Sequence, residues 1–444
     1  MTDHLLVFSD LHLAPPGLLN NFHSGSELAA CLRARCRPDT LLVLNGDVFD
    51  FLQMEARPSR LVLADIPPLL TSALDRMRSD ERGRDVLDAV GSHIRAGGRC
   101  LLIPGNHDPE LAHPEAVPLL RAALGLPPED ERLTFHVDSE PLVVQVGRWQ
   151  VVIGHGHRGD GWNDIEPALV RSAALSGEAF LDFPPGSRLV LETINALKRE
   201  RDPQSGTQRY AFIDLLKPEG LLMFVLLLWV APRLTLAHLP GFGSHGVQAI
   251  GRALRIRLRG GPFLKDAETA QPEGWADVLA GQIASVLTED ERRSPDMTLR
   301  GLEDWLAERA MPQPGMLAAP PAGGSYLGRL IHKLTHHFFD LQHLGDADRQ
   351  VVQAHLPEGS GPRILICGHT HSARQYALSD DRLYLNTGTW TDLMRFPTSP
   401  EDRDLMDWRE RLLRNEVPRL QRLTYAEVTP EGGALRWWRT DPVA

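Results

Sequence analysis

Short, continuous hydrophobic runs and stretches with helical spacing alternate through the first third of the chain. The spacing predicts helices at 26–35 and within 69–97, where 86–94 carries the clearest signal. The apolar runs that precede, separate and follow these stretches are Leu5–Phe8, Thr40–Leu44 and Arg99–Ile103. A strand, helix, strand order indicates parallel pairing, and continuous apolar runs are typical of a sheet buried on both faces. The pattern therefore predicts an α/β fold.

The later strands follow a different pattern, with more hairpins. Pro141–Val146 and Arg148–Ile153 predict a hairpin that turns at Gly147. We expect a helix near Asp404–Arg414, which is rich in arginine. The remaining predicted strands are Arg363–Cys367, Leu383–Asn386, Leu423–Val428 and Ala434–Arg439.

A long, mostly helical interruption separates these two groups of strands. It predicts a core in two parts, 1–157 and 361–444, with an inserted helical cap at 158–360. A linker rich in Pro, Gly and Ala, at 312–324, separates the last two predicted helices of the cap. Its candidate helices are Glu166–Ala174, Arg188–Arg199, Gly246–Arg259, Trp275–Thr288, Thr298–Ala310 and Tyr326–His343.

Polar side chains follow the ends of five of the predicted strands, where ligands bind in open α/β sheets. They are Asp10, His12, Asp47, Asn106, His155, His369 and His371. Carboxylate, amide oxygen and imidazole together suit a borderline divalent ion such as Mn²⁺, Fe or Zn²⁺. His157 follows His155 closely, but two neighbouring histidines need not both bind a metal ion. The sequence therefore predicts a seven-ligand site for two divalent ions, with Mn²⁺ favoured.

These side chains lie in five blocks, Asp-x-His, Gly-Asp, Gly-Asn-His-Asp, Gly-His-Gly-His and Gly-His-Thr-His, which occur in this order. The series resembles the calcineurin-like metallophosphoesterase superfamily over about 1–157 and 361–444. The resemblance implies a layered αββα sandwich.

The resemblance also implies a role for each residue. One ion would be held by Asp10, His12 and His371, and the other by Asn106, His155 and His369, with Asp47 between them. His107 would act as an acid or hydrogen-bond donor toward the substrate, and Asp108 would orient its ring. Thr370 and Asn386 are candidates for orienting the metal-binding imidazoles.

The implied activity is hydrolysis of a phosphomonoester or phosphodiester by metal-activated water. Two blocks, Ser-Asp-Leu-His-Leu and Gly-Asp-Val-Phe-Asp-Phe, are also similar to the UDP-2,3-diacylglucosamine pyrophosphohydrolases. Those enzymes typically have Arg at the position of His107, and their cap is shorter, so a nucleotide-lipid substrate is the alternative. A non-catalytic, metal-stabilised scaffold whose cap recruits a partner is the competing class.

Charge and hydropathy limit the partners. The net charge of −11 argues against general nucleic-acid binding. Leu221–Ala231 is the most apolar run, but its 11 residues fall short of the ~20 needed to cross a bilayer. A buried cap helix or a homodimer contact is favoured for it over a peripheral membrane contact. The N-terminus has no signal-peptide pattern, so we expect a cytoplasmic protein, with the inner membrane face as the alternative location.

Overall fold

The computed structural model describes residues 2–55, 57–215, 222–223, 226–227, 328, 331–332, 334–357, 361–439 and 442–443. The helices predicted at 246–259, 275–288 and 298–310, and the linker at 312–324, lie outside these residues. The chain divides into two compact units. The first comprises Met1–Ser187, Phe339–Met394 and Pro418–Ala444, and the second Arg188–Phe338 and Arg395–Val417. The predicted extent of the cap stays a prediction.

The first unit contains a six-stranded mixed sheet in the order β15-β14-β1-β2-β4-β5. The strands β1, β2, β4 and β5 are parallel, whereas β14 and β15 run antiparallel to their neighbours. Their bounds are β1 His4–Phe8, β2 Thr40–Asn45, β4 Arg99–Ile103, β5 Leu133–Phe135, β14 Leu423–Thr429 and β15 Gly432–Arg439. The predicted parallel pairing of the first strands is therefore confirmed.

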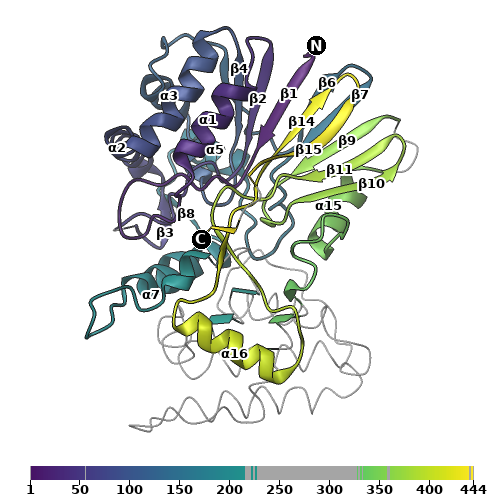
Figure 1. Cartoon of the computed structure of the whole chain (residues 1–444). Coiled ribbons are helices and arrows are strands. Elements are labelled where there is room, and N and C mark those ends of the chain that lie inside the picture. The colour runs from purple at the N-terminus through teal and green to yellow at the C-terminus, as the bar shows by residue number, and fades with distance from the viewer. Residues whose placement is uncertain are drawn as a thin grey trace, which may run out of the picture. The chain divides into compact units, whose positions relative to one another are not determined.

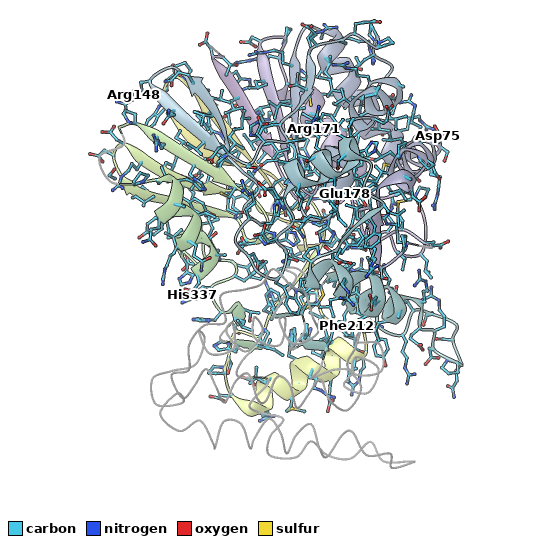
Figure 2. The ribbon with its side chains drawn as sticks, turned by 180° about the vertical axis from the view of Figure 1, so that it is seen from behind. Asp75, Arg148, Arg171, Glu178, Phe212 and His337 are labelled. Atoms are coloured by element: carbon cyan, nitrogen blue, oxygen red, sulfur yellow. The ribbon has the colours of Figure 1, made fainter. Side chains whose placement is uncertain are left out.

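A second sheet in the same unit has five strands in the order β10-β11-β9-β7-β6. Here β7, β9 and β11 are parallel, and β6 and β10 pair antiparallel at the two edges. The bounds are β6 Leu142–Val146, β7 Trp149–Ile153, β9 Arg363–Cys367, β10 Arg374–Ser379 and β11 Arg382–Asn386. The β6–β7 hairpin turns at Gly147 and Arg148, as predicted, and Arg148 marks its tip in Figure 2.

The two sheets bury one hydrophobic core between them. Side chains at alternate positions of both sheets contribute to it, such as Leu5 and Val7 of β1 and Ile364 and Ile366 of β9. The opposite face of β9 packs with Val352 of α15 (Asp346–His355). The helices α1 (Gly25–Arg35), α2 (Ile66–Ser79) and α3 (Glu81–Arg95) lie beside the first sheet and α15 beside the second (Figure 1). The predicted layered α/β sandwich is confirmed.

The sequence pattern missed several elements of the first unit. The single helical stretch predicted within 69–97 is two helices, because Asp80 adopts an extended backbone and its side chain accepts a hydrogen bond from the Gly83 amide. Strand β10 was not predicted because polar residues and a bulge interrupt it. Helix α15 was not predicted either, since its apolar positions are few.

The second unit is described only in part. It contains a π-helical segment at Val190–Ile194, α7 (Asn195–Arg199) and α16 (Asp402–Leu413). Within the predicted apolar run Leu221–Ala231, the side chains of the four described residues are buried, and the other residues lie outside the description. No helix of the described residues is long and apolar enough to span a membrane.

The layered core makes a direct prediction about stability. Ile364→Ala would remove fully buried methyl groups from between the sheets, so we expect it to lower the free energy of unfolding by about 2–5 kcal/mol. Val143→Ala is the matched control, because Val143 of β6 is 55% exposed and should change stability by less than about 0.5 kcal/mol. Denaturant unfolding followed by fluorescence measures both. Equal effects would contradict the described sandwich.

Candidate metal centre

The candidate ligands have an unusual backbone. Six non-glycine residues in the described part of the chain have a positive φ, and five of them are predicted ligands: Asp10, His12, Asp47, His369 and His371. Side chains other than glycine, asparagine and aspartate rarely adopt this left-handed conformation, which costs free energy and concentrates at functional sites. The chain therefore holds these side chains in place against local backbone preference.

Four of the candidates form one compact cluster. Single ligand atoms of Asp10, His12, Asp47 and His371 all lie within 4.8 Å of one another, and all four residues are buried. The Nε2 atoms of His12 and His371 are 3.0 Å apart. His371 Nε2 also lies 3.0 Å from Asp10 Oδ1. This geometry makes the cluster a candidate metal site built from β1, β2 and β9.

Asp47 connects this cluster with further candidates. Its Oδ2 lies 4.0 Å from His12 Nε2 and 3.2 Å from His155 Nε2. The other oxygen, Oδ1, accepts a hydrogen bond of 2.8 Å from the backbone amide of His107. The carboxylate of Asp47 thus faces imidazoles from both sheets.

The remaining candidates are His369 and Asn106. The ring of His369 is 5.5 Å from that of His155, measured between centroids. Asn106 follows β4 and is 1% exposed, and its Oδ1 has no hydrogen-bond partner among the described residues. A buried amide oxygen without a partner is costly, so the free acceptor on Asn106 fits a cation.

The imidazole protons can be assigned from their partners. His12 Nδ1 lies 3.1 Å from Asp50 Oδ2, and His155 Nδ1 lies 2.9 Å from the carbonyl oxygen of Asn45. Because carboxylate and carbonyl oxygens only accept, both Nδ1 atoms must carry hydrogen, and each neutral ring then presents a lone pair at Nε2. Burial lowers the pKa of His155, but the carboxylates of Asp47 and Asp10 raise it to about 9, so in the absence of a metal ion Nε2 carries a proton that faces Asp47 Oδ2 at 3.2 Å. A metal ion could take the place of this proton between the two side chains, so the donor set fits divalent metal ions.

At two positions of the motifs, a neighbouring carboxylate lies so close to the backbone that only glycine fits. A Cβ on Gly105 would lie 2.2 Å from Asp47 Oδ1, and one on Gly368 would lie 2.3 Å from Asp10 Oδ2. No side chain fits at such distances. The glycines that precede Asn106 and His369 therefore allow the strand-end loops to close on the carboxylates.

The ring of His107, in the neighbouring loop, contacts Asp50, with Nδ1 3.1 Å from Oδ1. The expected orientation of this ring by Asp108 stays a prediction. Asp108 accepts backbone hydrogen bonds from Gly105 at 2.6 Å and from Val48 at 2.8 Å. It also accepts one of 3.0 Å from Phe49. Asp108 therefore joins the loop after β4 to the loop after β2.

Electrostatics favour ionised carboxylates in this interior. Burial alone would raise the pKa of Asp47, but the charges of His155 and His107 hold it well below its ordinary value. For Asp50, burial is likewise outweighed by His107 and by hydrogen bonds from His107 and His12, so its pKa is also lowered. Both groups stay negative at neutral pH and attract cations.

Several partners of the candidate ligands were missed by the sequence analysis. Asp50 lies three residues after Asp47, a spacing that could have drawn attention to it. Asp160 faces His369, with Oδ2 3.1 Å from Nε2, and nothing in the sequence connects the two. Asn386, expected to orient imidazoles, donates to the Gly368 carbonyl at 2.8 Å and so holds the loop backbone.

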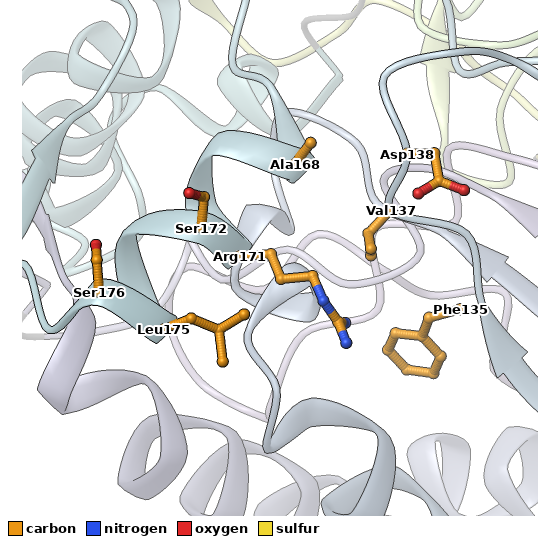
Figure 3. A pocket seen from close by; sticks show the side chains of 8 residues that line it. All are labelled: Phe135, Val137, Asp138, Ala168, Arg171, Ser172, Leu175 and Ser176. Atoms are coloured by element: carbon orange, nitrogen blue, oxygen red, sulfur yellow. The ribbon is translucent and has the colours of Figure 1, made fainter.

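A pocket of about 720 Å³ lies apart from these residues (Figure 3). It lies between the segment that follows β5 and one face of α5 (Pro167–Ser176), with the side chain of Arg171 directed into it. No candidate ligand lines it.

Comparison with known proteins agrees with the geometry. Residues 4–209 match the model of the calcineurin-like phosphoesterase family, which spans the strand-end loops of β1, β2, β4 and β7. No curated protein matches the chain. Residues 4–209 are therefore similar to the calcineurin-like phosphoesterase family.

Proposed function

We propose that the protein is a dinuclear metal-dependent phosphoesterase that hydrolyses a phosphomonoester or phosphodiester. One ion would be held by Asp10, His12 and His371, and the other by Asn106, His155 and His369. Asp47 would bridge them. The observation that carries this proposal is the position of the Asp47 carboxylate, which faces His12 on one side and His155 on the other.

The donor set also suggests the ions. Carboxylate and amide oxygens with neutral imidazoles suit Mn²⁺, and Fe or Zn²⁺ would also fit. When bound, two such ions would neutralise the charge of the phosphoryl group and lower the pKa of a water molecule to near neutral.

In this proposal, the side chain of His107 supplies a proton to the leaving oxygen of the substrate. Asp50 accepts from His107 Nδ1, so Nδ1 keeps its hydrogen and Nε2 is left to give or take a proton. The ring of His107 is edge-on to that of His12 at 4.7 Å between centroids, which keeps it beside the proposed ions. We assign His107 as the general acid and Asp50 as the group that orients it. Asp108 supports the same loop through its backbone contacts.

Metal removal and replacement test the ion requirement. Protein stripped with a chelator should not hydrolyse p-nitrophenyl phosphate or bis-p-nitrophenyl phosphate, and added Mn²⁺ should restore turnover. Asp47→Ala should lower the restored rate by more than about 10²-fold, because losing a ligand exceeds the 10–100-fold effect typical of outer-sphere changes. Asp39→Asn is the control, since Asp39 is exposed at the surface before β2.

Full metal-dependent turnover by Asp47→Ala would contradict the proposed site. If the protein binds two ions but hydrolyses neither ester, a lipid-linked pyrophosphate is the next substrate to test. Inactivity there as well would favour the scaffold interpretation. The preferred ester separates monoesterase from diesterase.

The role of His107 has its own test. His107→Ala should lower kcat by about 10²–10⁴-fold, the usual contribution of a general acid, while both ions stay bound. Metal analysis of the purified variant and steady-state kinetics measure the two effects separately. His113→Ala is a nearby control, because His113 follows the loop and its ring accepts a hydrogen bond at Nδ1 from the Glu115 amide. An unchanged kcat in His107→Ala would remove the acid role and leave the metal site intact.

A further inference from the structure

The carboxylate of Asp160 lies against a predicted ligand that is 209 residues away in the sequence. Its Oδ2 is 3.1 Å from His369 Nε2, and the two side chains are 25% and 10% exposed. A partly buried carboxylate at this distance accepts a charge-assisted hydrogen bond from the ring. Asp160 therefore fixes which nitrogen of His369 carries the proton.

The position of Asp160 is itself determined by a closed loop between β7 and α5. His157 Nε2 lies 2.9 Å from the carbonyl oxygen of Ile165, which closes the loop. Within it, Asp160 accepts hydrogen bonds of 3.0 Å from the Trp162 amide and from Asn163 Nδ2. The carboxylate is thus held before any ion binds.

Three of the candidate imidazoles have an acceptor on one ring nitrogen. His12 has Asp50, His155 has the Asn45 carbonyl and His369 has Asp160. Partners of this kind orient a ligating ring and raise its basicity.

We infer that Asp160 is a positioning residue for the second metal ion and acts through His369. With the proton held on Nε2, the lone pair available to a metal ion is on Nδ1. This inference rests on the two-ion site proposed above. It assigns the loop between His157 and Ile165 to the metal centre, where its closure sets the affinity for one ion and not the other.

Metal titration tests the inference without relying on turnover. Mn²⁺ binding to the metal-free protein, followed by calorimetry, should resolve two sites in the wild type. Asp160→Asn should weaken the second site about 10–100-fold and leave the first unchanged. Asp164→Asn is the matched control, because Asp164 lies in the same loop and accepts from the Gly159 amide, not from His369. The unfolding midpoint of metal-free Asp160→Asn should equal that of the wild type.

A double-mutant cycle with His369→Ala identifies the route of the effect. If Asp160 acts through His369, Asp160→Asn should weaken the second site no further in the His369→Ala background, measured at millimolar Mn²⁺. If the two substitutions lower the Mn²⁺ affinity of the second site additively, Asp160 is a ligand itself and the positioning role is wrong. Unchanged affinity of the second site in Asp160→Asn would also overturn the positioning role. A wild type that binds fewer than two ions would contradict the proposed function instead.

Discussion

The convergence of buried ionisable side chains at the strand ends is the constraint on which this structure depends. Imidazole nitrogens and carboxylate oxygens lie within 4.8 Å of one another there, where little water can screen them. The backbone does not relax away from this arrangement, since Asp10, Asp47 and His371 keep left-handed conformations. Such strain persists only where the surroundings over-determine it. Cations bound between these atoms would offset the cost of the arrangement, which agrees with the proposed metal centre.

The two sheets supply the rigidity that this arrangement needs. The first sheet supplies Asp10, His12 and Asp47, after β1 and β2. The second sheet supplies His155, His369 and His371, after β7 and β9. The core between the sheets includes Val43 and Ile366, close to these ends, and both are fully buried. A shift of one sheet against the other would disturb close packing throughout the core. The relative positions of the ligands therefore depend on the core as much as on the loops.

The sequence predicted those parts of the site that depend on short patterns of neighbouring residues. Continuous apolar runs predicted the strands, and the polar residues after them predicted Asp10, Asp47 and His155 as neighbours in space. The hydrogen-bond partners could not be predicted in this way. Asp108 is adjacent to His107, yet Asp50 contacts the ring, because the orientation of a side chain depends on where the β2 loop lies. The contact between Asp160 and His369 joins the loops after two paired strands of the second sheet, β7 and β9, and carries no local signal because the two residues are 209 positions apart.

Asp50 links two functions that are usually considered separately. Its Oδ2 accepts from His12 and its Oδ1 from His107, so one carboxylate orients a predicted metal ligand and the predicted acid. A rotation of Asp50 that improved one contact would lengthen the other. A metal ion bound by His12 would fix the first ring and thereby restrict the carboxylate, which would in turn hold the second ring. The proposed acid would then be positioned best with the metal site occupied, and proton transfer would be coupled to metal binding through Asp50.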